Sequence, residues 1–206
     1  MNIGIVNVGI GNIGSLKGAL YQQGYETTEV HSSTDLKNIS HLILPGVGAY
    51  SSAMDRLEKA KLIDPIRGFV KSGNPLLGIC LGMQILSSFG IEGGNTDGLN
   101  LIPGNVTKIQ VRGKLRLPHI GWNNVNIKVK HPVIKGLKDE KDFYFVHAYH
   151  YSFLESKYII ATTKYGAAFP SIIGNHNIVG MQFHPEKSQR NGLMLLDNFC
   201  MWNGLC

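Results

Sequence analysis

Residues 75–89 have the sequence PLLGICLGMQILSSF, and this stretch decides the fold. A short apolar run at 75–80 predicts a buried β-strand, and residues 82–89 predict the helix that follows it. Cys80 stands at the junction, between Gly78 and Gly82. A glycine two residues before and two after a nucleophile is the pattern of a nucleophile elbow, here with cysteine in place of serine. We therefore expect the thiol of Cys80 at the end of a buried strand, where a helix N-terminus favours its ionised form.

The same alternation of strand and helix extends through the first half of the chain. Further strands are predicted at 2–8, 26–31 and 41–45, and helical patterns at 13–23 and 51–72. The second half is richer in strands and ends in a helical run at 190–203; its predicted strands are 105–111, 124–129, 143–147, 158–164, 168–173 and 178–183.

This order predicts a single α/β domain over residues 1–206. We expect an open, doubly wound, mostly parallel sheet flanked by helices, with an antiparallel strand extension. Ligands of such sheets bind beyond the carboxyl ends of the strands. The ends to watch follow Leu44, Ile79 and Phe183.

His184 and Glu186 are the predicted partners of the cysteine. They belong to the sequence Gln182-Phe-His-Pro-Glu186, directly after an apolar strand. A cysteine nucleophile needs a base, and a carboxylate can hold the far nitrogen of an imidazole and select its tautomer. A lone buried cysteine is commonly core filler, but the elbow glycines together with this segment favour the nucleophile.

Two glycine-rich loops have weaker functional signals. The loop Leu44-Pro-Gly-Val-Gly-Ala49 could donate a backbone N–H to an oxyanion or could be a plain turn. The sequence Gly9-x-Gly11-x-x-Gly14 is typical of dinucleotide sites, in which an acidic residue about twenty positions on holds the ribose. Glu29 is the available residue and does not stand at a clear strand end, so we interpret this segment as a strand-to-helix turn.

Composition narrows the functional classes. The chain has 206 residues and a formal charge of +6, but its basic residues are scattered and no nucleic-acid motif accompanies them. No apolar run is long enough for a membrane span and no signal peptide begins the chain, so we expect a cytoplasmic location without a membrane partner. Cys80, Cys200 and Cys206 form neither a disulfide framework nor a zinc pattern, and no metal is expected.

Taken together, these segments resemble the triad (class I) glutamine amidotransferases over essentially the whole chain. The resemblance rests on Gly9-x-Gly11-Asn12, Pro45-Gly-Val-Gly48, Gly78-Ile-Cys-Leu-Gly-Met-Gln84, Asn95-Thr-Asp-Gly-Leu99, Leu101-Ile-Pro-Gly104, Pro118-His-Ile-Gly-Trp-Asn123, Phe145-Val-His-Ala-Tyr149 and Gln182-Phe-His-Pro-Glu-Lys-Ser-Gln189.

The resemblance implies a glutaminase without a cofactor. Cys80 would attack the side-chain amide of L-glutamine, His184 would act as its acid and base, and Glu186 would orient His184. The backbone N–H groups of Leu81 and of the Val47–Gly48 loop would hold the oxyanion. The residues that match the family's glutamine-binding positions are Gly48, Gln84, Glu92, His147, Ala148 and Tyr149.

Within this family the resemblance is closest to glutaminase subunits of histidine biosynthesis. These form a heterodimer with a separate (β/α)8 barrel cyclase that receives the ammonia. Asn12, Trp122 and Lys187 match their interface positions. Three alternatives stay open: a paralogue that supplies a sugar amidotransferase of surface polysaccharide synthesis, a non-catalytic regulatory subunit, and an elbow-bearing cysteine peptidase.

Overall fold

The computed structural model describes residues 1–111, 113–139, 141–152 and 154–205. Cys206, which was among the cysteines considered above, lies outside the described residues. Within the described residues, no helix is long and apolar enough to cross a membrane.

A nine-stranded sheet of described residues forms the centre of the molecule, with its strands in the order β2-β1-β3-β4-β13-β12-β11-β8-β9. The parallel strands are β2 (Thr27–Val30), β1 (Ile3–Val6), β3 (His41–Leu44), β4 (Leu76–Ile79) and β13 (Ile178–Met181). The antiparallel strands are β12 (Ala167–Asn175), β11 (Ile159–Tyr165), β8 (His119–Ile127) and β9 (Lys141–His147). The predicted α/β sheet with an antiparallel extension is confirmed.

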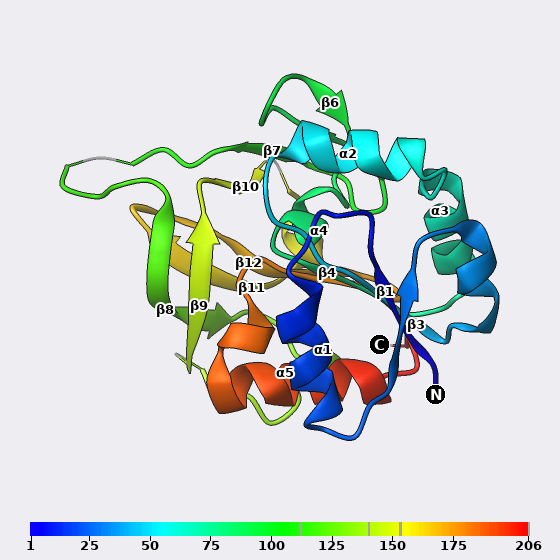
Figure 1. Cartoon of the computed structure of the whole chain (residues 1–206). Coiled ribbons are helices and arrows are strands. Elements are labelled where there is room, and N and C mark those ends of the chain that lie inside the picture. The colour runs from blue at the N-terminus through cyan, green and yellow to red at the C-terminus, as the bar shows by residue number, and fades with distance from the viewer. Residues whose placement is uncertain (112, 140, 153, 206) are drawn as a thin grey trace.

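Helices cover both faces of the parallel strands (Figure 1). Helices α1 (Ile13–Tyr21) and α5 (Gln189–Met201), blue and orange to red, lie together on one face, and α2 (Tyr50–Lys59) and α3 (Ile63–Lys71) lie on the other. Successive strand residues point to opposite faces. In β3, the side chain of Ile43 therefore packs into the core under α1 and α5. The side chains of Leu42 and Leu44 pack into the core under α2 and α3. These two cores account for the continuous apolar runs in the sequence.

A smaller second sheet covers part of the α2 side. Its strands are β10 (Tyr149–Ser152), β7 (Asn105–Lys108), β5 (Phe89–Gly90) and β6 (Thr96–Asp97). Val106 and Tyr151 attach it to the core beneath α2 and α3. Short 3-10 helices occur at Ser33–Asn38, Pro132–Ile134, Ser156–Tyr158 and Pro185–Lys187.

Two predicted helices differ from the structure. The helical pattern at 51–72 belongs to two helices, because Lys61 takes a φ of 55° and ends the first of them. The apolar periodicity continues across the break because both helices pack apolar side chains into the same hydrophobic core. The helix predicted at 82–89 is only α4 (Leu81–Gln84), since the chain turns through 85–88 into β5.

Strands β3, β4 and β13 are parallel neighbours, so their carboxyl ends share one edge of the sheet. They end at Leu44, Ile79 and Met181. The third strand thus ends two residues before the predicted Phe183. This edge brings together the predicted loop, elbow and His-Pro-Glu segment.

Candidate active site

Cys80 occupies a sharp turn between β4 and α4. Its φ of 54° and ψ of −110° lie outside the ordinary regions for an L-residue, a conformation that costs on the order of 1–3 kcal/mol. The flanking glycines are sterically required. A Cβ on Gly82 would lie 1.7 Å from the carbonyl oxygen of Leu44, and one on Gly78 would lie 2.6 Å from the carbonyl oxygen of Gly82. The strand-to-helix turn therefore closes only because these positions lack side chains.

His184 and Glu186 form a buried pair just beyond β13. Nδ1 of His184 lies 2.8 Å from Oε1 of Glu186, and the two side chains are only 4% and 6% exposed. A carboxylate accepts a hydrogen bond from the protonated Nδ1, so this contact leaves Nε2 as the nitrogen that can exchange protons with the reacting groups. Neither Nε2 of His184 nor Oε2 of Glu186 has a hydrogen-bond partner among the described residues.

The electrostatics of His184 connect this pair to the elbow. Burial disfavours the charged imidazolium, but the Cys80 sulfur and the Glu186 carboxylate favour it, and the pKa of His184 is raised to about 10. Cys80 is itself 6% exposed and buried in the core beneath α1 and α5. The fold thus brings the three predicted triad residues into one site although their strands are far apart in sequence.

The predicted oxyanion loop rests directly on the elbow. A Cβ on Gly46 would lie 2.8 Å from the Cβ of Leu81. Leu81 is the first residue of α4, and the N–H of a first helical residue has no intrahelical partner. The N–H of Val47 donates to the carbonyl of Ile10 instead of pointing to the elbow. Val47 would therefore have to leave Ile10 before it could serve an oxyanion.

Four of the predicted glutamine-binding residues form one connected group. The carbonyl of Tyr149 accepts from Nε2 of Gln84 at 2.9 Å and from Nδ1 of His147 at 2.8 Å. The carbonyl of Ala148 accepts from the N–H of Ile109 at 2.9 Å. Gln84 comes from α4 and the others from the end of β9 and the start of β10, so the elbow helix and the second sheet meet here.

Gly48 and Glu92 lie instead around the start of α2. Oε2 of Glu92 accepts from the N–H of Tyr50 at 3.3 Å, and Gly48 takes a φ of 106° two residues earlier. Burial raises the pKa of Glu92, and the Tyr50 N–H opposes this shift. The predicted pocket residues thus lie in two groups, one where α4 meets the β9–β10 connection and one at the start of α2.

His119 is a buried residue to which the sequence assigned no role. Its Nδ1 lies 2.9 Å from Nε2 of His147, and its Nε2 lies 3.2 Å from Nδ2 of Asn123. Burial lowers the pKa of His119 to about 4 and that of His147 to about 3, so both rings are neutral at pH 7. The Pro118-His-Ile-Gly-Trp-Asn123 run is the sequence signal for this pair, but it does not reveal the tertiary partner.

The predicted interface residues Asn12, Trp122 and Lys187 are exposed. The ring of Tyr144 lies 6.1 Å from that of Trp122 and 6.0 Å from Nζ of Lys187. Asn12 and Lys187 line a cavity of about 20 Å³ that also touches His184, which is room for about one water molecule. The three residues therefore form one surface beside the predicted triad.

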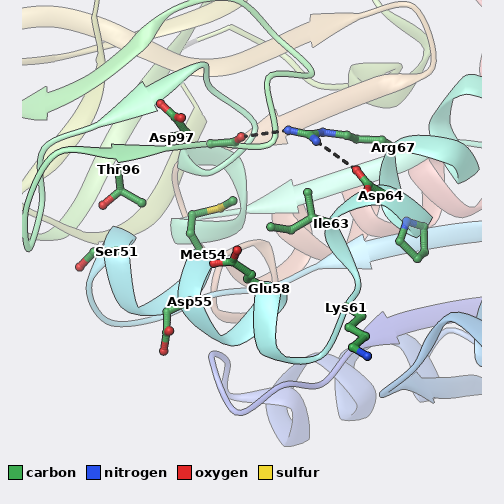
Figure 2. A pocket seen from close by; sticks show the side chains of 12 residues that line it. Ser51, Met54, Asp55, Glu58, Lys61, Ile63, Asp64, Arg67, Thr96 and Asp97 are labelled. Atoms are coloured by element: carbon green, nitrogen blue, oxygen red, sulfur yellow. Dashed lines mark hydrogen bonds and ion pairs between the residues drawn. The ribbon is translucent and has the colours of Figure 1, made fainter.

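A much larger groove, of about 880 Å³, is lined by residues of α2, α3 and the segment 96–98. Figure 2 shows its lining side chains from α2, α3 and the segment of β6. Arg67 contacts Asp64 at 3.2 Å and the carbonyl of Gly98 at 3.4 Å across it. None of the predicted triad, oxyanion or glutamine-binding residues lines this groove.

Hydrogen bonds from neighbouring segments hold the glycine-rich turn after β1. Nη1 of Arg56 donates to the carbonyls of Val8 and Gly9, and the side chain of Glu29 accepts from Lys17 and Asn7. These contacts agree with a strand-to-helix turn. Among the described residues, no group of three or more His, Cys, Asp and Glu side chains could hold a metal ion.

Comparison with known proteins identifies the family. The model of the family "Glutamine amidotransferase class-I" matches residues 5–202. The chain is 42% identical over 200 residues to "Imidazole glycerol phosphate synthase subunit HisH" of Desulfitobacterium hafniense (strain DSM 10664 / DCB-2), covering 97% of this chain and 94% of that protein. It is 44% identical over 204 residues to "Imidazole glycerol phosphate synthase subunit HisH 2" of Vibrio vulnificus (strain YJ016), covering 98% and 95%.

Solved structures show the same fold at low sequence identity. "Crystal structure of glutamine amidotransferase" has a TM-score of 0.77 at 20% identity, covering 98% of this chain and 99% of the other. "Structure of PurLQS from Thermotoga maritima" has a TM-score of 0.74 at 15% identity, covering 97% of each chain. With the family match over nearly its full length, the chain belongs to the class-I glutamine amidotransferases.

Proposed function

We propose that the chain is one glutaminase domain over residues 1–206 and the ammonia-producing subunit of imidazole glycerol phosphate synthase. The observation that carries this proposal is the meeting of Cys80, on its strained elbow, with the buried His184–Glu186 pair. A thiol, an imidazole and an orienting carboxylate are the parts of a nucleophilic acyl transfer. Relatives that are 42–44% identical to this chain are named as subunits of imidazole glycerol phosphate synthase, and this is why we propose that synthase.

In this mechanism the Cys80 thiolate attacks the side-chain amide carbon of L-glutamine. The backbone N–H groups of Leu81 and of the Val47–Gly48 loop stabilise the oxyanion. His184 gives its Nε2 proton to the departing nitrogen, the carbon–nitrogen bond breaks, and ammonia leaves a thioester on Cys80. His184 then takes a proton from water, which releases glutamate and restores the thiolate.

The glutamine pocket combines the two groups of residues described above. We assign Gln84, His147, Ala148 and Tyr149 to one side and Gly48 with Glu92 to the other. The half-buried carboxylate of Glu92 is complementary to an α-ammonium group. The neutral rings and backbone groups of the first side can hold the uncharged part of the substrate.

The proposed partner is a (β/α)8 barrel cyclase that forms a heterodimer with this chain in the cytoplasm and consumes the ammonia. Asn12, Trp122, Lys187 and the intervening Tyr144 form the docking surface, which we call the Trp122 surface. It adjoins the cavity beside His184, so a bound partner would lie next to the place where ammonia forms. The Val47–Ile10 hydrogen bond supports a weak glutaminase that partner binding activates.

The test is a glutamate-release assay on the purified chain, alone and with the barrel cyclase and its nucleotide ligand. We expect a low rate alone and a large stimulation by the complex. Cys80→Ser should abolish glutamate release and still form the complex, because the sulfur is buried and is not part of the exposed Trp122 surface.

Two outcomes would contradict the proposal. Glutamine turnover by Cys80→Ser would exclude the thioester mechanism. A wild-type chain that no barrel cyclase stimulates, but that a sugar amidotransferase does, would assign the ammonia to surface polysaccharide synthesis.

A further inference from the structure

We propose that Gln182 is a positioning residue that holds the thiolate of Cys80 through a fixed amide N–H, an inference that rests on the proposed nucleophilic role of Cys80. Nε2 of Gln182 lies 3.8 Å from Sγ of Cys80, and the carbonyl oxygen of Val146 lies 3.9 Å from the same sulfur. A thiol can donate to Val146 and accept from Gln182. A thiolate can only accept, so the Gln182 contact favours the charged sulfur.

The orientation of the Gln182 amide follows from its neighbours. The carbonyl of Tyr149 can only accept, so the group of Gln84 that faces it at 2.9 Å must be the NH2. The same NH2 lies 3.1 Å from Gln182, which must therefore present its oxygen, Oε1, to Gln84. The NH2 of Gln182 is then left facing Cys80. A single backbone carbonyl thus sets the direction of both side-chain amides.

This chain of contacts is buried and anchored. Gln182 is 0% exposed and Gln84 is 3% exposed, so water does not compete for their bonds. The backbone N–H of Gln182 donates to the carbonyl of Ser171 at 2.9 Å in the adjoining strand. The side chain lies two residues before His184, so one short segment positions both the base and the donor to the sulfur.

The geometry also separates the roles of Gln182 and His184. His184 exchanges protons with the reacting groups, whereas an amide N–H cannot give up its proton and only stabilises negative charge. The Cys80 sulfur is among the groups that raise the pKa of His184. A donor that stabilises negative charge on the sulfur would therefore also favour the protonated His184 that the leaving nitrogen needs.

The experiment follows the ionisation of Cys80 without any substrate. The rate of iodoacetamide alkylation is measured against pH on the full chain, with the Cys80 peptide quantified by mass spectrometry. In Gln182→Met, which keeps the length of the side chain and removes the N–H, we expect the midpoint of the profile to move to higher pH. Below that midpoint alkylation should be about tenfold slower, the effect of one hydrogen bond to a charged group.

Two further variants make the test specific. Gln84→Met leaves Gln182 in place but removes the group that orients it, and should shift the profile in the same direction. Asn177→Leu removes a buried amide at the opposite end of β13, where it binds the carbonyls of Val70 and Asn74, and should leave the profile unchanged. Thermal unfolding of each variant gives the loss of stability separately.

An unshifted profile in both Gln182→Met and Gln84→Met would overturn the proposal, and so would an equal shift in Asn177→Leu. The proposed function fails differently. A wild-type chain that alkylates as expected, but releases no glutamate with any partner, would contradict the glutaminase and leave the role of Gln182 intact.

Discussion

Nδ1 of His184 lies 2.8 Å from Oε1 of Glu186, with both side chains almost fully buried. The contact fixes the tautomer of the imidazole and contributes to its raised pKa. Four predictions test the surroundings of this pair, the buried histidines, the elbow and the docking surface.

Glu186→Gln should lower the rate of glutamate release by about 10²–10⁴, because the amide keeps the shape but not the charge that stabilises the imidazolium. It should also lower the pKa of His184 from about 10. The measurement is the rate across pH 6–10 in the complex. Glu155→Gln is the control, since it removes an exposed carboxylate paired with Lys157. Equal rates in wild type and Glu186→Gln would contradict the role given to Glu186.

Acid should destabilise the protein below pH 6.5 through His119 and His147. Burial lowers the pKa values of these rings to about 4 and about 3, whereas both titrate near 6.5 in the unfolded chain. Between pH 6.5 and 4 the unfolded chain therefore binds more protons, and the free energy of unfolding falls as pH falls. At about 1.4 kcal/mol per pKa unit, we expect a loss of about 4–5 kcal/mol for the pair by pH 4.5.

Urea unfolding at pH 7.0, 5.5 and 4.5 measures this loss. His119→Phe should reduce the pH dependence by about half, since a phenyl ring can keep the stacking on Tyr165 and Phe145 but does not titrate, whereas His147 still does. His31→Gln, at an exposed position, should leave it unchanged. A pH dependence that is the same in all three proteins would assign the acid lability to other groups.

Gly82→Ala should destabilise the fold by at least about 3 kcal/mol. The new Cβ would lie 1.7 Å from the carbonyl oxygen of Leu44, a backbone atom that cannot turn away. Gly18→Ala is the matched control: nothing lies within 4 Å of its Cβ, and an alanine in the interior of a helix stabilises it by about 0.5–1 kcal/mol. Denaturant midpoints measure both changes. Opposite signs are expected, and a neutral Gly82→Ala would contradict the close contact.

Trp122→Ala should weaken binding of the barrel cyclase by about 30-fold or more, because a large exposed aromatic ring at an interface commonly contributes at least about 2 kcal/mol. Trp122 is 49% exposed in the free chain. Titration calorimetry gives the dissociation constant. Met201→Ala, at a 72% exposed position on the end of α5, should bind like the wild type. Unchanged binding by Trp122→Ala would move the interface elsewhere.

The sequence predicted the parts of the fold that depend on local pattern. Short apolar runs marked β1, β3, β4 and β13 because strands buried on both faces are apolar throughout. The elbow was visible because two glycines must flank Cys80 for the chain to turn there. The positions of the predicted triad residues follow from the parallel order of these strands.

The remaining features depend on tertiary neighbours. The break at Lys61 leaves the apolar periodicity of 51–72 intact, so the pattern cannot reveal it. The hydrogen bond from the N–H of Val47 to the carbonyl of Ile10 joins two glycine-rich loops. Each loop could adopt several backbone conformations, so the local sequence does not predict this bond. Gln182 and His119 belong to sequence motifs that can be recognised. The orientation of the Gln182 amide and the tautomer of the His119 ring, however, depend on tertiary partners such as the carbonyl of Tyr149.

The strand order also has a consequence for synthesis of the chain on the ribosome. Cys80, the proposed nucleophile, follows β4, and His184, the proposed base, follows β13; β4 is hydrogen-bonded to β13 on one side. About a hundred residues separate the two, so at about 5–20 residues per second the thiol emerges some 5–20 s before its base. A nascent chain therefore holds Cys80 before the segment that carries His184 and Glu186 has been made. The last parallel strand to be made therefore completes this edge of the sheet, and the predicted triad is assembled only when synthesis is nearly finished.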